Sequence, residues 1–294
     1  MRTVYLGTAE FAAVLLRRLA ASPHRPVLVV TRPDRPRGRG RRLASPPVAA
    51  VALELGIELA QPESVNDEPA LATIAAAGPD VVCVCAFGAL IKEPLLSRYS
   101  MLNVHPSLLP RWRGAAPIER AIMNGDEHSG ISIMQVGEGF DDGPVCARAS
   151  EPITPEDTYG SLAARLEVLG ADLLVRTLDE SPPCVPQDEA LATYAAKIGS
   201  ADRELDPSRP AAQLERTVRA LTPHIGAYLS LDDGQRLGVS AARVLSDGPP
   251  AGEVSFDGIR PVLGCGEGAL ELLAVKPPGR RAMSGEEYLR GRRR

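Results

Sequence analysis

Residues 80–86 read DVVCVCA, and every position after Asp80 is apolar. A strand without polar alternation is typical of a sheet that is covered on both faces. Further apolar runs occupy Thr3–Leu6, Pro26–Thr31, Met101–His105 and Gly130–Val136. Helical patterns separate them at Glu10–Ala20, within Leu43–Leu55, at Asp67–Ala77 and at Pro117–Met123. Strands that alternate with helices predict an α/β fold with a mostly parallel sheet.

The pattern of predicted secondary structure changes after the midpoint of the chain. A long helix, which Asp157 or Thr158 can cap, is followed by a Pro-rich segment that we interpret as a linker. Beyond it, a helix at Ala211–Ala220 and short strand-like runs between turn residues predict a small barrel-like β domain. We therefore predict three parts: a domain at 1–180, a linker at 181–204 and a second domain at 205–294.

The composition is that of an ordinary globular protein, with 294 residues, 44% hydrophobic and 24% charged. No apolar run approaches the ~20 residues that cross a bilayer, and the N-terminus lacks a signal-peptide pattern, so we expect no membrane location. The cysteines are scattered and odd in number, which predicts buried free thiols in a reducing cytoplasm. They are Cys83, Cys85, Cys146, Cys184 and Cys265. We expect no metal, because Cys83 and Cys85 lack a second pair with zinc-ligand spacing.

Positive charge is concentrated in two stretches. Residues 32–42 hold six Arg and one Asp, and residues 276–294 also have a net charge of +5. The whole chain has a net charge of −4, so the remainder is strongly acidic. Such local basic patches favour contact with a polyanion. Prolines and glycines rule out a regular helix across 32–42, and a solvated irregular loop is the alternative to an RNA contact.

Residues 101–114 contain the densest group of polar side chains. Asn103 and His105 are two apart on a predicted strand, so their side chains point the same way, and Pro106 ends the strand. That end of an open α/β sheet holds the ligand crevice. An imidazole that handles a proton beside an amide that stabilises an oxyanion suits acyl transfer. A purely structural His and Asn remain the alternative.

The second polar cluster is the loop GEGFDDG at residues 137–143. A carboxylate from this loop near His105 would orient the imidazole, although solvated turn residues are the simpler interpretation. We find no nucleophile motif, no Walker A loop and no dinucleotide fingerprint.

Together these motifs resemble the folate-dependent formyltransferases. The resemblance rests first on three patterns in order: N-x-H, S-L-L-P-x-x-x-G, and Asp in G-x-D-x-G. It also includes LGTxxFA at the start, TRPDRPxGRG, and GRRAMS near the end. The resemblance spans nearly the whole chain; Ala9, where the family usually has Pro, departs from it. It implies a Rossmann-like catalytic domain and a C-terminal domain of OB type that binds tRNA.

The resemblance also implies the reaction and the site. The formyl group of 10-formyltetrahydrofolate would pass to the α-amino group of methionine on initiator tRNA. Separately from the resemblance, we expect a monomer. Asn103, His105 and Asp141 match the catalytic set. The folate would lie against Phe87, Gly88, Ala89, Leu90, Ser107, Leu108, Leu109 and Pro110. The tRNA would contact Arg35, Arg37, Gly38, Arg39, Arg41 and Arg42.

Two alternatives stay open from the sequence. A sister formyltransferase that acts on a small amine, such as a purine precursor or an amino sugar, would share residues 103–143, but it needs neither the basic loop nor the second domain. An RNA-binding module with a silent α/β half is disfavoured only by the intact set of Asn103, His105 and Asp141.

Overall fold

The computed structural model describes residues 1–37, 40, 42–231 and 234–292. Its contacts divide into two compact units, which we treat separately. The first unit comprises Met1–Gly114, Ser129–Glu151 and Ala163–Tyr194; the second comprises Ala115–His128, Pro152–Leu162 and Ala195–Arg294. Within the described ranges, no helix combines the length and the apolarity that a membrane span requires.

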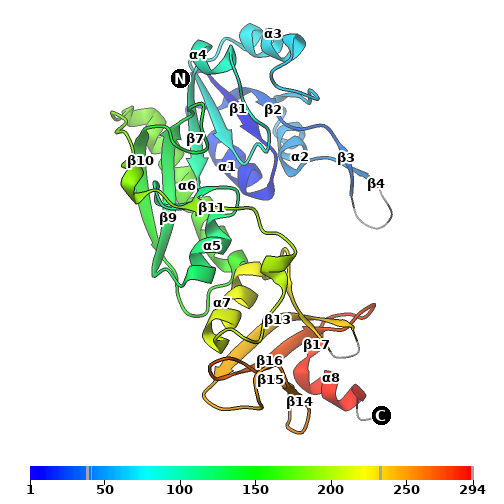
Figure 1. Ribbon diagram of the computed structural model, residues 1–294. Coiled ribbons are helices and arrows are strands. Elements are labelled where there is room, and N and C mark those ends of the chain that lie inside the picture. Colours follow the sequence, from blue (N-terminus) through cyan, green and yellow to red (C-terminus); the bar gives the residue numbers. More distant parts are fainter. Residues whose placement is uncertain (38–39, 41, 232–233, 293–294) are drawn as a thin grey trace. The chain divides into compact units, whose positions relative to one another are not determined.

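The first unit is built on a seven-stranded sheet with the order β10-β9-β7-β6-β1-β2-β5 (Figure 1). Its strands are β1 (Thr3–Gly7), β2 (Pro26–Val30), β5 (Glu58–Ala60), β6 (Val81–Cys85), β7 (Ser100–His105), β9 (His128–Gln135) and β10 (Val145–Pro152). The five strands from β5 to β7 pair in parallel, and β9 pairs antiparallel with β7. The predicted mostly parallel α/β sheet is therefore confirmed.

The two central strands, β1 and β6, are buried at every position, as the run DVVCVCA predicts. Val4, Leu6 and Val84 join one hydrophobic cluster with side chains of the helices on one face. Tyr5 has the opposite orientation, and its hydroxyl donates to the carbonyl of Ala12 in the first helix. Strand alternation thus gives each face its own core.

The helices are α1 (Glu10–Ala20), α2 (Pro47–Glu54), α3 (Glu68–Ala77), α4 (Leu95–Arg98), α5 (Pro117–Asn124), α6 (Tyr159–Glu180), α7 (Ala211–Leu221) and α8 (Gly285–Arg292), with short 3-10 turns at Glu189–Leu191 and Ala201–Arg203. In the first unit α1 and α6 lie beside one another, joined by an Arg18–Asp172 ion pair of 2.6 Å (Figure 1). Thr158 caps α6: its Oγ1 accepts from the Ser161 N–H, and its own N–H donates back to Ser161 Oγ.

The basic stretch is not the irregular loop that we expected. Strands β3 (Arg35–Arg37) and β4 (Arg42–Ala44) form an antiparallel hairpin across it. Prolines and glycines exclude a helix but not a two-stranded ribbon. Pro36 has no backbone N–H, and it fits a strand position whose nitrogen faces away from the partner strand. Gly38, Arg39 and Arg41 lie outside the described residues.

The second unit contains a six-stranded antiparallel sheet. Its strands are β12 (Ala227–Ser230), β13 (Arg236–Leu245), β14 (Val254–Ser255), β15 (Val262–Gly264), β16 (Ala269–Lys276) and β17 (Met283–Ser284). The order is β12-β13-β16-β15-β14, with β17 also on β16. Leu214, Val218 and Leu221 of α7 are buried in one cluster with residues of this sheet. The predicted second domain of short β-strands is confirmed, and its sheet is antiparallel.

The second unit also holds a histidine–carboxylate pair. His224 Nε2 lies 2.9 Å from Oε1 of Glu119 on α5. The ring of Tyr159 stacks on the imidazole, with 3.6 Å between centroids. Arg219 on α7 adds a hydrogen bond near this pair, because its Nη1 donates to the carbonyl of Asp157.

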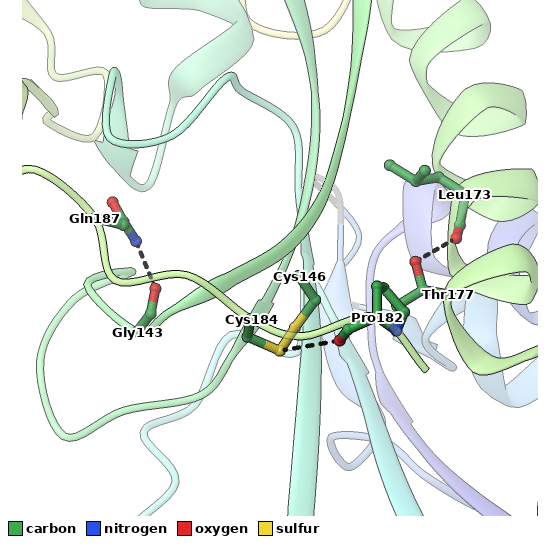
Figure 2. The surroundings of a disulfide bond; sticks show 7 residues. All are labelled: Gly143, Cys146, Leu173, Thr177, Pro182, Cys184 and Gln187. Carbon is green, nitrogen blue, oxygen red and sulfur yellow. Dashed lines mark hydrogen bonds between the residues drawn. A yellow bond between two sulfur atoms is a disulfide. The ribbon is translucent and has the colours of Figure 1, made fainter. Parts of the chain in front are cut away.

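The cysteines depart from expectation at two positions. Cys146 on β10 and Cys184, 38 residues later, form a disulfide (Figure 2). The prediction of five free thiols was wrong here, because the fold brings together two cysteines whose spacing carries no signal. Cys83, Cys85 and Cys265 are free and buried, as predicted. Burial raises the pKa of Cys83 and Cys85 to about 12, so these thiols stay protonated near neutral pH.

Candidate active site

The carboxyl end of β7 presents the first two site residues. Asn103 and His105 alternate with the buried Leu102 and Val104, so both side chains leave the same face of the strand. The neighbouring strands β6 and β9 pair with β7 up to Asn103 and His105, respectively. The side chain of His105 is only 5% exposed, so its ring is held in the protein and presents little surface to water.

Asp141 reaches this strand end from the loop after β9. Its Oδ1 accepts from Asn103 Nδ2 at 3.3 Å, and its Oδ2 lies 3.5 Å from His105 Nδ1. The backbone N–H of Gly114 also donates to Oδ2, at 2.9 Å. The carboxylate is thus in contact with an amide, an imidazole and a main-chain donor, although the three residues that supply them span only positions 103–114.

The second imidazole nitrogen fixes the ring. His105 Nε2 lies 2.9 Å from the carbonyl oxygen of Trp112, which can only accept, so the proton of a neutral ring belongs on Nε2. Nδ1 then faces Asp141 and is the position that can take up or release a proton. Asn103 uses one N–H on Asp141, and its amide has a second N–H with which to meet a developing oxyanion.

The two predicted folate segments differ in how they are built. Phe87 is buried, while Gly88, Ala89 and Leu90 are exposed in an irregular stretch after β6. Internal donors from Thr8, Arg32 and Asn66 bind the carbonyls of Phe87, Gly88 and Leu90, respectively. Arg32 begins the basic stretch, so this bond connects that stretch to the segment after β6.

The Ser107–Pro110 segment makes hydrogen bonds with other parts of the protein. Ser107 is buried, and its Oγ donates to the Arg111 carbonyl at 2.6 Å. Leu109 is 2% exposed, and its N–H donates to Ser132 Oγ. Leu108 and Pro110 are half-buried. The buried members of this segment hold the turn that carries Trp112 and Gly114 to the site.

Two residues beside the site had no part in the sequence-based prediction. Gln187 donates from Nε2 to the carbonyls of Asp141 and Gly143. Arg113 donates from Nε to Gln187 Oε1 at 3.1 Å, and its side chain is 2% exposed. Arg113 lies at an unspecified position of S-L-L-P-x-x-x-G, and an arginine gives no sign of burial from sequence alone. Gln187 stood inside the predicted linker.

With this geometry established, comparison with known proteins defines the class. The Formyl transferase family matches residues 1–178, and the family Formyl transferase, C-terminal domain, matches residues 197–293. The chain belongs to the formyl transferase family.

Relatives that it matches over nearly their whole length are named methionyl-tRNA formyltransferase. One from Halorhodospira halophila is 45% identical, covering 99% of this chain and 96% of the relative. Another, from Ruegeria pomeroyi, is 42% identical over 99% and 97%, respectively.

Solved structures share the fold. Methionyl-tRNA formyltransferase from Clostridium thermocellum matches with a TM-score of 0.61 at 14% identity, covering 83% of this chain and 93% of that one. HypX from Aquifex aeolicus in complex with tetrahydrofolic acid matches with a TM-score of 0.64 at 18% identity, covering 98% and 47%.

Proposed function

We propose that this protein transfers the formyl group of 10-formyltetrahydrofolate to the α-amino group of methionyl initiator tRNA, giving N-formylmethionyl-tRNA for translation initiation. The convergence of Asn103, His105 and Asp141 at the end of β7 carries the proposal. The full-length relatives with this named activity support it.

In the proposed mechanism each of the three residues has a distinct role. Asn103 and the protonated ring of His105 stabilise the negative charge that develops on the formyl oxygen. Asp141, 3.5 Å from His105 Nδ1, holds the charge of the ring and assists proton transfer through water. A preorganised amide donor and a fixed positive charge lower the barrier because they need no rearrangement as charge forms.

We propose that Phe87–Leu90 and Ser107–Pro110 hold the folate, which supplies the formyl group. The fit rests on the open backbone after β6. At Gly88, where φ is +73°, a Cβ would have no atom of the described residues within 4 Å. The apolar side chain of Leu90 is 55% exposed beside it. An open, irregular backbone with an apolar neighbour suits the edge and face of a flat heterocycle.

We propose that the basic hairpin meets the tRNA through Arg35, Arg37 and Arg42, together with Gly38, Arg39 and Arg41. Arginines pair with phosphates, and the exposed position of Arg42 suits this role. The functional parts we propose are a catalytic domain at 1–180, a linker at 181–204 and an OB-type tRNA-binding domain at 205–294. We further propose a monomer that acts in the cytoplasm, where charged tRNA is found.

A formylation assay tests the activity. Purified protein is incubated with 10-formyltetrahydrofolate and initiator tRNA that carries radiolabelled methionine, and formylmethionine is quantified after hydrolysis of the ester. We expect product from charged tRNA and none from free methionine. Formylation of free methionine, an amino sugar nucleotide or a purine precursor at a rate equal to that of charged tRNA would favour the alternative, a small-amine formyltransferase.

A further inference from the structure

The segment after α6 runs along the loop that carries Asp141. Val185 and Val145 exchange two backbone hydrogen bonds of 2.8 and 2.9 Å. The disulfide between Cys184 and Cys146 lies beside this bridge (Figure 2). Residues 184–187 therefore lie antiparallel to the chain that leaves the loop.

The same segment, a few residues later, binds the other wall of the site. The N–H of Thr193 donates to the carbonyl of Pro110, and its carbonyl accepts from the N–H of Arg113. Thr193 Oγ1 accepts from the N–H of Trp112 at 2.9 Å. Residues 184–193, which we call the bridging segment, thus connect the Asp141 loop with residues 110–113.

Gln187 lies at the centre of the bridging segment. Its Nε2 donates to the carbonyls of Asp141 and Gly143, both at 2.8 Å, and Figure 2 shows the second bond. Its Oε1 accepts from Arg113 Nε. Only one orientation of the amide satisfies all three bonds, because carbonyls cannot donate and a guanidinium cannot accept.

Arg113 is itself immobilised. Its Nη1 and Nη2 bind the two carboxylate oxygens of Glu189, at 2.9 and 2.7 Å, in a two-point contact that fixes the guanidinium plane. This hydrogen bonding lowers the pKa of the Glu189 carboxyl and so keeps it charged. Gln187 therefore accepts a hydrogen bond from a guanidinium that is itself held in place.

These contacts close a ring around the reacting groups. Arg113 lies between Trp112, whose carbonyl fixes His105, and Gly114, whose N–H binds Asp141. Its side chain returns to the backbone of Asp141 through Gln187. A shift of one member therefore changes the position of the others.

The loop needs such a restraint. Asp141 has a φ of +53°, a left-handed conformation that residues other than glycine rarely adopt. Such a conformation persists where the surroundings over-determine it. Gly143 sits so close to the carbonyl oxygen of Gln135 that any Cβ there would collide with it.

We propose that Gln187 is a positioning residue, which holds the backbone at Asp141 and Gly143 so that the Asp141 carboxylate stays between Asn103 and His105. The inference rests on the proposed catalytic role of Asp141. Gln187 itself acts on the backbone and has no part in the chemical step.

Two substitutions test the proposal. Gln187→Ala removes all three bonds. Gln187→Glu keeps the contact with Arg113 but cannot donate to the two carbonyls. We expect both variants to lower kcat by about 10- to 100-fold, the loss that a small misplacement of a reacting group causes, with KM for both substrates nearly unchanged. Val185→Ala is the matched control, because that exposed residue binds through its backbone. Full turnover in the folded Gln187→Glu protein would overturn the proposal.

A double-mutant cycle separates positioning from general structural damage. Gln187→Ala is introduced into Asp141→Asn, and the unfolding free energy is measured for every variant. If Gln187 acts through Asp141, it should cause little further loss in that background. An undiminished further loss overturns the inference. Low turnover in Asp141→Asn with full turnover in Gln187→Ala overturns this inference alone. Full turnover in Asp141→Asn overturns the catalytic assignment of Asp141 as well.

Discussion

His105 with Asp141 in the first unit and His224 with Glu119 in the second are both histidine–carboxylate pairs, and their surroundings differ. In the second unit, His224 and Glu119 are 2.9 Å apart, and the ring of Tyr159 covers the imidazole. In the first unit, His105 and Asp141 are farther apart, at 3.5 Å. Pair distance alone would therefore favour His224 and Glu119 over the pair that we propose to be catalytic.

The two pairs differ in the residues that surround them. Around Asp141 an amide, a backbone N–H and the bridging segment converge at the carboxyl end of a parallel strand, where ligands bind in this fold. Around His224 the neighbour is the stacked ring of Tyr159, which restrains the imidazole. We therefore expect the imidazole and carboxylate to serve chemistry in the first unit and stability in the second.

The largest expected contrast comes from the same type of change in both pairs. Asp141→Asn should lower kcat by about 10²–10⁴, the range of general acid–base contributions, because the amide cannot hold the charge of His105. Glu119→Gln should leave kcat unchanged. Single-turnover formylation at saturating substrates measures both. Equal effects of the two changes would break the comparison.

The second contrast concerns the oxyanion donor. Asn103→Ala should lower kcat by roughly 10²–10³, because one preorganised donor is lost. Tyr159→Leu, which removes the neighbour of the other histidine, should leave kcat at the wild-type value. Near-normal turnover in a folded Asn103→Ala protein would remove this residue from the mechanism.

A third contrast uses stability in place of rate. His224→Ala should lower the free energy of unfolding by about 1–2 kcal/mol, because an aromatic stack is lost and the Glu119 carboxylate keeps a buried position without its partner. The estimate is reduced because the His224 side chain is 29% exposed. Urea denaturation measures it, and turnover should persist. An unchanged free energy of unfolding would show that the His224–Glu119 pair contributes nothing to stability.

The smallest effect is expected at the basic hairpin, which contributes no residue to either pair. If Arg42 contacts one phosphate, Arg42→Ala should reduce the slope of log tRNA affinity against log salt concentration by about 0.7–0.9. Folate binding and kcat at saturating tRNA should not change. Titrations at several salt concentrations supply the slope, and a wild-type slope would exclude a phosphate contact by this residue.

Sequence patterns were most informative where local periodicity and burial agree. The predicted helix at Glu10–Ala20 has the same bounds in the structure, and β6 lies within the run DVVCVCA. Strand β10 was missed because it is an edge strand whose positions alternate between partly buried and exposed, with polar residues among them. A half-exposed edge leaves only a weak apolar signal.

The site was predictable only in part, for a related reason. Asn103 and His105 lie on one strand, so their spacing places them together. The contacts of Gln187 and of Cys184 join segments that are distant in the chain, and no local pattern encodes such contacts. Prolines around Gln187 indicate a break in periodicity correctly, but they say nothing about what the segment touches.

The bridging segment also orders events in time. Gln187 is synthesised 46 residues after Asp141. At ribosomal speeds of about 5–20 residues per second, that interval lasts roughly 2–9 s. Throughout it, the residues of β7 have already been synthesised, while the carboxylate loop still lacks its amide partner. A nascent chain therefore contains Asn103, His105 and Asp141 seconds before it contains the residue that we propose to position the carboxylate.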